Sequence, residues 1–222
     1  MKKTVLILIS LLTPLILGVN VSAQESRSDS NEVRTRVGEP KEQGGPVLEW
    51  GMLINETLEI GNGSRYNKMV KTITNGNYTA PTSIGSSEAN QYWCTFLVID
   101  AFNLAGHSGL SRTAGHGAVV GMARFWSNTP TGYVFVDYLN DNRRIADVQP
   151  GYAVFWVTDR SLNHTGSEHT ALVIEITTDS RGNGRLTTID SNSYNKSNTY
   201  VISDWKIVNQ PYNYTYGFGG VN

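Results

Sequence analysis

The sequence of 222 residues is poor in cysteine and has no basic stretch. Its one cysteine, Cys94, cannot form a disulfide within the chain. Lys and Arg number 18 against 19 Asp and Glu, and the isoelectric point of about 6.4 lies below neutral. This charge balance argues against a nucleic-acid binder. The chain also lacks internal repeats and any sign of a second domain, so its length fits one domain with additional segments.

The N-terminus has the pattern of a secretory signal peptide. Two lysines precede a nearly uninterrupted apolar run over residues 4–19, and small residues ending at Ala23 form a cleavage signal. The alternative is a membrane anchor, but the run is short for a span and a polar region follows it. The residue directly after the cleavage signal is Gln24 and not a cysteine, which argues against a lipid anchor there. We therefore expect a protein that is secreted or held in the cell envelope (periplasm or cell wall), without stable membrane insertion after cleavage.

Residues 24–46 contain no aromatic side chain and almost no large apolar one. Such a segment cannot bury enough surface to offset the entropy lost on ordering, so we predict a disordered linker. The domain is then expected over residues 47–222.

The remaining pattern predicts an α+β domain, with N-terminal helices packed on an antiparallel sheet. Apolar residues recur at helical spacing in the first part of the domain, and alternating strand-like segments follow. The expected helices are 47–60, 65–73, 91–106 and 114–126, with a stop at Gly106. The expected strands, connected as a meander, are 133–138, 153–157, 169–176, 186–191 and 200–205.

Cys94 falls in the first turn of the expected helix 91–106. Unpaired backbone N–H groups and the positive end of the helix dipole favour a thiolate at that place, and a thiolate can act as a nucleophile. The alternative is a small core residue on an apolar helix. Secretion favours the first interpretation, because exported proteins usually pair their cysteines and an unpaired one is then a working thiol or an exposed liability.

His169 opens an expected strand, on one face with Ala171, Val173 and Glu175. If the hairpin closes symmetrically between residues 180 and 181, His169 lies opposite residue 192 and diagonal to residue 190. A histidine beside a carboxylate and an amide suits a general base. The alternative is a structural histidine hydrogen-bonded across the sheet.

His164, His169 and Asp190 are the residues that could form a zinc site. The spacing of these residues matches no established ligand pattern. We expect no metal and no cofactor.

Four short motifs in this order resemble CHAP domains and their NlpC/P60 relatives, which have a papain-like fold. The first is Trp-Cys-Thr-Phe-Leu-Val from Trp93, which is similar to the family's cysteine helix. The second is a Pro-Gly strand, the third a strand opening with histidine, and the fourth a strand carrying a carboxylate and an amide. They occupy residues 93–98, 150–156, 169–173 and 189–192.

The resemblance implies a cysteine hydrolase that cleaves peptidoglycan, either as an N-acetylmuramoyl-L-alanine amidase or as an endopeptidase. By position, Cys94 matches the family nucleophile and His169 the general base. Asp190 and Asn192 match the carboxylate and amide positions. Peptidoglycan is then the expected partner, and a monomer the expected state.

Three residues just before the cysteine are candidates for contact with substrate. The Cys94 N–H, helped by the side chain of Asn90 or Gln91, is expected to stabilise an oxyanion. Trp93 is a candidate for lining a glycan groove. The alternative is favoured in each case: an ordinary surface-loop residue for Asn90 and Gln91, and a core residue for Trp93.

The chain departs from the family pattern at three positions. Tyr152 stands where Asp is usual, Glu168 stands where Gly usually precedes the histidine, and Asp190 replaces the commoner Glu. Tyr152 and Glu168 support a rival interpretation, a secreted cell-wall-binding or structural module that keeps the fold without turnover.

Overall fold

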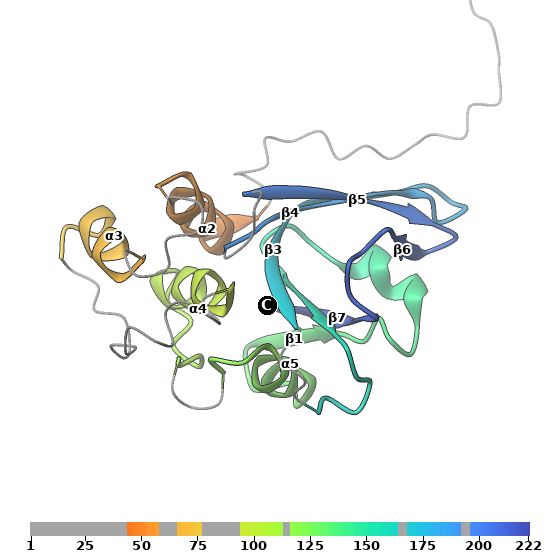
Figure 1. Cartoon of the computed structure of the whole chain (residues 1–222), viewed down its shortest axis with the longest axis horizontal. Coiled ribbons are helices and arrows are strands. Elements are labelled where there is room, and N and C mark those ends of the chain that lie inside the picture. The colour runs from red at the N-terminus through yellow and green to blue at the C-terminus, as the bar shows by residue number, and fades with distance from the viewer. Residues whose placement is uncertain (1–43, 58–65, 77–93, 113–115, 164–167, 192–195) are drawn as a thin grey trace, which may run out of the picture. The chain divides into compact units, whose positions relative to one another are not determined.

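The computed structural model describes residues 44–57, 66–76, 94–112, 116–163, 168–191 and 196–222, all within one compact unit of residues 33–222. The α-helices precede the strands along the chain, as the sequence predicts (Figure 1). The helices are α2 (Gly45–Thr57), α3 (Tyr66–Ile73), α4 (Cys94–Leu104), α5 (Val119–Ser127) and the 3₁₀ helix η2 (Asn142–Asp147). The strands are β1 (Tyr133–Val136), β2 (Ala153–Val157), β3 (His169–Thr178), β4 (Gly184–Ile189), β5 (Ser197–Ser203), β6 (Lys206–Val208) and β7 (Tyr214–Val221).

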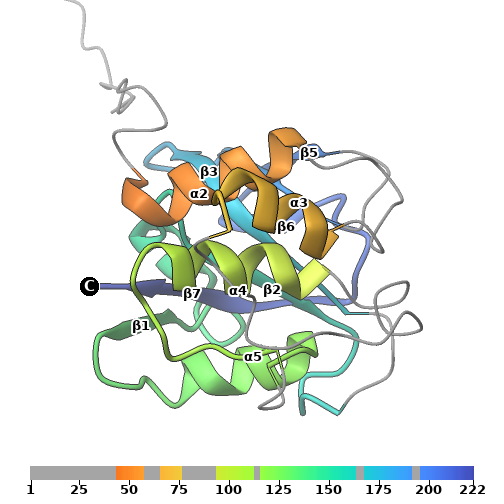
Figure 2. The same cartoon turned by 90° about the vertical axis from the view of Figure 1, so that its left-hand side faces the viewer.

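The strands form one antiparallel sheet in the order β1-β7-β2-β3-β4-β5-β6. Helices α2, α3, α4 and α5 lie together on one side of it (Figure 2). The sheet is curled, and Tyr138 connects its two edges: its hydroxyl donates to the Trp205 carbonyl (2.9 Å) and accepts from the Ile207 N–H (2.8 Å). The predicted α+β architecture is therefore confirmed.

Each face of the sheet has its own apolar core. Alternate residues of β2 illustrate this, because Phe155 packs in the core shared with the helices, whereas Val154 and Trp156 pack in the core enclosed by the curl. All five side chains of β2 are buried, which explains why this strand is apolar throughout rather than alternating.

The expected meander is wrong at one place, because β7 lies between β1 and β2. Strand β7 is not predicted from the sequence, because this segment is rich in glycine and glycine is depleted in strands. The glycines make room for aromatic rings: a Cβ at Gly219 would lie 2.4 Å from the Trp126 ring, and one at Gly220 would lie 2.2 Å from the Tyr152 ring. Trp126 Nε1–H also donates to the Gly220 carbonyl (3.0 Å).

The β3–β4 register agrees with the prediction at the end where β3 begins. Leu172 lies opposite Ile189 and Val173 opposite Thr188, which is the register that would place residue 169 opposite 192. The register then shifts by one residue, so that Glu175 pairs with Thr187. This bulge changes the facing of the side chains. Glu175 is exposed and does not join the face of Val173, contrary to the prediction.

The helix of Cys94 ends as the sequence predicts. Gly106 adopts a positive φ of 94°, its N–H donates to the Asn103 carbonyl, and the His107 N–H donates to the Phe102 carbonyl. This is the Schellman arrangement that glycine favours. Helix α2 begins at Gly45, two residues inside the segment expected to be linker, and ends at Thr57.

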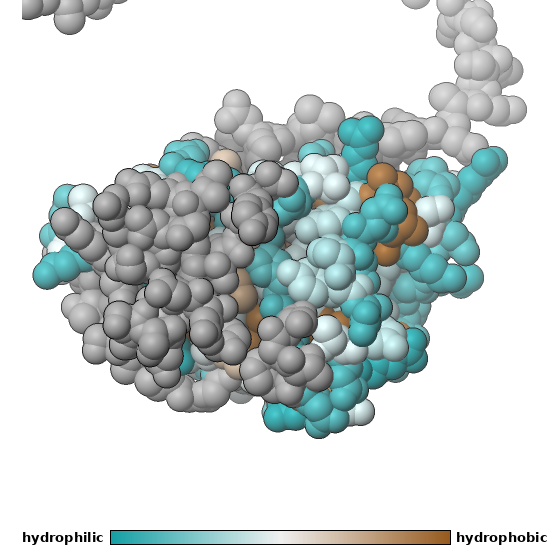
Figure 3. Space-filling view, in the orientation of Figure 1, coloured by the Kyte–Doolittle hydropathy of each residue, from teal (hydrophilic) through white to brown (hydrophobic). Residues whose placement is uncertain are grey.

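Helix α5 begins at Val119, later than the expected position 114. Among the residues that the structure describes, no helix is long and apolar enough to cross a membrane. The described surface over the strands is mostly hydrophilic, with a small apolar patch (Figure 3).

Candidate active site

The first residue of α4, Cys94, lies beside the start of β3 and the residues that follow β4, and it is only 6% exposed. Two hydrogen bonds fix this end of the helix. Ser191 Oγ–H donates to the Cys94 carbonyl (3.1 Å), and Thr95 Oγ1–H donates to the Gly117 carbonyl (2.9 Å). Ser191 follows β4 by two residues, so the start of the helix is held against the exit of this strand. The first backbone N–H groups of a helix have no partner within it and can stabilise negative charge.

His169, the first residue of β3, lies between Cys94 and Asp190. Its Nε2 is 2.7 Å from Asp190 Oδ1, and a side-chain hydrogen bond also connects the imidazole to Cys94. Each ring nitrogen offers one in-plane bond. Nε2 is occupied by the carboxylate, which leaves Nδ1 for the sulfur. The ring thus has the two-sided orientation that a general base requires.

The carboxylate of Asp190 is buried (2% exposed) and held by further hydrogen bonds. Its Oδ2 accepts from Thr188 Oγ1–H (2.9 Å) and from Asn198 Nδ2–H (3.0 Å). Asn55 of α2, also buried, donates its Nδ2–H to the Asp190 carbonyl (2.8 Å). With both carboxylate oxygens and the backbone fixed, Asp190 presents Oδ1 to His169 in one orientation.

This environment raises the pKa of His169 from 6.5 to about 10. Burial alone lowers the pKa, because it disfavours the charged imidazolium. Hydrogen bonds to Asp190 and Cys94, together with the negative charges of a Cys94 thiolate and of the Asp190 carboxylate, outweigh that effect. The environment therefore favours the charged imidazolium, in which one ring N–H is directed to Asp190 and the other to Cys94.

Aromatic rings surround the imidazole. The ring planes of Trp156 and Tyr212 lie 7° and 14° from that of His169, with centroids 5.9 Å and 5.8 Å away. Tyr200 packs against Trp156 at 5.2 Å. Burial, followed by the nearby charges of Cys94 and Asp190, raises the pKa of Tyr212 to about 12. Burial and the charge of Asp190 likewise raise the pKa of Tyr200.

Of the residues expected at the site, Cys94, His169 and Asp190 are brought together from α4, β3 and the end of β4. The others, Asn90, Gln91, Trp93 and Asn192, lie outside the described residues.

Several residues at the site were not singled out as functional in the sequence. Thr188 shares its face with Asp190, so strand alternation carried a signal for it. Asn55, Asn198 and Tyr212 have no local signal, because they reach the site only through tertiary packing.

The two other departures from the family pattern lie in different places. Tyr152 precedes β2, is half-buried, and its ring covers Gly220. Burial and the charge of Asp147 raise the pKa of its hydroxyl. Glu168 immediately precedes β3 and is half-buried beside the candidate base. Tyr152 is therefore a packing residue, whereas Glu168 adjoins the site.

No group of three or more His, Cys, Asp or Glu side chains in the described part of the chain is arranged to hold a metal ion. His164, which the zinc interpretation requires, is outside that part.

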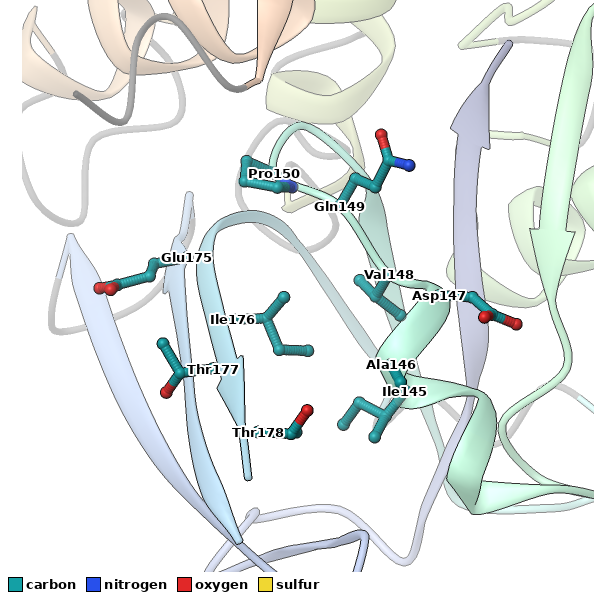
Figure 4. Close-up of a pocket in the computed structure, with 10 residues that line it drawn as sticks. All are labelled: Ile145, Ala146, Asp147, Val148, Gln149, Pro150, Glu175, Ile176, Thr177 and Thr178. Atoms are coloured by element: carbon teal, nitrogen blue, oxygen red, sulfur yellow. The ribbon is translucent and has the colours of Figure 1, made fainter. Parts of the chain in front are cut away.

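A pocket of about 610 Å³ lies between η2 and β3 and contains none of the three site residues. The side chains of Ile145, Val148 and Ile176 converge in it, whereas those of Asp147 and Glu175 point outward (Figure 4). It is separate from the candidate active site.

Comparisons of the chain with protein-family models, with curated proteins and with solved structures found no match.

Proposed function

We propose that this protein is a secreted thiol hydrolase with a papain-like fold of the NlpC/P60–CHAP type, which cleaves amide bonds in peptidoglycan. The observation that carries the proposal is the buried series Cys94–His169–Asp190, in which one imidazole contacts the only thiol and a fixed carboxylate. A histidine that served only to connect two strands would not need the thiol at its second nitrogen.

The proposed reaction is acyl transfer through a thioester. Cys94 Sγ attacks the amide carbonyl carbon while the thiol proton resides on His169. The carbon–nitrogen bond then breaks as His169 gives that proton to the leaving amine. Water, deprotonated by His169, attacks the thioester and releases the acid, with the thiol restored. Asp190 stabilises the imidazolium, and the Cys94 N–H at the start of α4 stabilises the oxyanion.

The substrate class rests on the resemblance of the four motifs to CHAP and NlpC/P60 domains, together with the signal-peptide pattern. The motifs point to peptidoglycan, and the signal-peptide pattern supports export to the envelope. The two family activities, amidase and endopeptidase, differ in the bond that is cut, and the products distinguish them.

The decisive experiment is digestion of purified peptidoglycan by residues 24–222, followed by mass spectrometry of the released fragments. Cys94→Ala serves as the matched control. Fragments released only by the thiol-bearing protein support the hydrolase and identify the bond. No fragments from several wall types would contradict the proposed activity.

Alkylation of Cys94 provides a test that needs no substrate. Because the chain has one cysteine, uptake of iodoacetamide reports this residue alone. We expect rapid alkylation at neutral pH that slows in His169→Ala. A thiol that reacts only on unfolding, together with inactive digests, would instead favour the binding or structural module.

A further inference from the structure

Three nearly parallel rings meet at His169. The planes of Trp156 and Tyr212 differ by 20° with centroids 6.0 Å apart, and both are close to parallel with the imidazole plane. The two aromatic residues differ in their surroundings. Trp156 is fully buried in the core of the curled sheet, whereas Tyr212 is half-buried in the segment that connects β6 to β7.

We propose that Tyr212 is a positioning residue, whose ring holds the imidazole of His169 in the plane where it contacts both Asp190 and Cys94. Both hydrogen bonds of the imidazole lie in its ring plane, so a tilt of the ring weakens the two together. A parallel neighbouring ring opposes that tilt. The inference rests on the proposed function, because it concerns the same thiol and base.

The role assigned to Tyr212 belongs to its ring rather than to its hydroxyl. The pKa of Tyr212 is raised to about 12, first by burial and then by the charges of Cys94 and Asp190, so the hydroxyl stays neutral at neutral pH. Tyr212→Phe keeps the ring that lies parallel to the imidazole and should preserve the function of this residue, whereas Tyr212→Ala removes the ring and should not. The titratable side chains that contact His169 are Cys94, Asp190 and Tyr212; Tyr200 lies near Asp190, and Glu168 precedes His169 in the chain.

The test measures alkylation of Cys94 across the pH range in Tyr212→Phe and Tyr212→Ala. The matched control is Tyr216→Ala, which removes another half-buried tyrosine ring. The centroid of that ring lies 5.7 Å from the centroid of the Phe135 ring. We expect Tyr212→Ala to slow alkylation at neutral pH about tenfold, since misplacing a catalytic group costs that much or more. Its pH profile should change shape, whereas Tyr212→Phe and Tyr216→Ala should keep the wild-type profile.

A second measurement detects the orientation of the imidazole directly. The proton between His169 Nε2 and Asp190 should give a downfield, slowly exchanging NMR signal, assigned by its loss in His169→Gln. We expect Tyr212→Phe to retain this signal and Tyr212→Ala to lose it. Circular dichroism should show that both variants are folded. Retention in folded Tyr212→Ala, with an unchanged alkylation profile, overturns the inference.

Failure of this inference can be distinguished from failure of the proposed function. If wild-type Cys94 alkylates slowly and independently of His169, both fail. If it alkylates rapidly and depends on His169 but not on the Tyr212 ring, the base stands and only the positioning role is lost.

Discussion

Two buried pairs of opposite charge lie near α4, and they differ in the cation. Asp100, within the helix, pairs with Arg112, and both side chains are fully buried. Asp190 pairs with His169, whose side chain is 9% exposed. Arginine keeps its charge at any pH a protein survives, so the first pair is permanent. Histidine can release its proton, and only the second pair contacts the thiol. One carboxylate thus belongs to a permanent structural ion pair, and the other belongs to the site for which we propose proton transfer.

Breaking the permanent pair should have the largest effect on stability. Asp100→Ala leaves Arg112 buried without this carboxylate, which typically costs about 3–5 kcal/mol of the free energy of unfolding. Urea unfolding measures the loss. The matched control is Asp147→Ala, which breaks an exposed pair: the side chains of Asp147 and Arg144 are 58% and 43% exposed. This change should cost at most about 1 kcal/mol of the free energy of unfolding. Equal losses in the two variants would contradict the comparison.

The histidine pair should make stability depend on pH, with a sign that follows from its pKa. In the folded protein the pKa of His169 is about 10, above its ordinary value of 6.5. The stabilisation that the charged His169 gives the folded protein is therefore fully present below about pH 6.5 and is lost as the pH rises through about 10. We expect the difference in unfolding free energy between wild type and His169→Gln to shrink across that interval. A difference that grows with pH would show that the imidazole is neutral in the folded protein.

The support of Asp190 by α2 should have a smaller effect. Asn55 donates to the carbonyls of Asp190 (2.8 Å) and Lys196 (3.0 Å). Asn55→Ala removes both donors and should cost about 1–3 kcal/mol in urea unfolding. The control is Asn140→Ala, which removes an exposed hydrogen bond to Asp137 and should change stability by less than about 0.5 kcal/mol. A matching small change in Asn55→Ala would mean that these carbonyls find other donors.

The smallest effect on stability is expected at the thiol itself. Cys94→Ala should abolish hydrolysis but change the free energy of unfolding by less than about 1 kcal/mol. It removes the hydrogen bond to His169, whereas a thiol-sized side chain at the start of α4 contributes little packing area. Thermal unfolding of Cys94→Ala and Cys94→Ser checks this. A loss of several kcal/mol with unchanged activity would identify a packed core residue.

Strand periodicity located much of the candidate site before the structure did. It placed His169 at the start of a strand and Asp190 on the face of its partner, and a symmetric hairpin gave the correct register at that end. The bulge between Val173 and Glu175 was not predictable from alternation. It lies beyond the site, so the error affected Glu175 and not the His169–Asp190 contact.

Tertiary packing supplied what the local pattern lacked. The sequence by itself determined the helix that begins near Cys94, its stop at Gly106, and the alternation that pairs β3 with β4, because all three depend on neighbours close in the chain. Only the tertiary structure inserted β7 between β1 and β2, brought Asn55 to Asp190, and placed Tyr212 beside His169. These contacts join residues far apart in the chain. They depend on how aromatic rings and glycines pack against one another, which cannot be predicted from the spacing of residues within one segment.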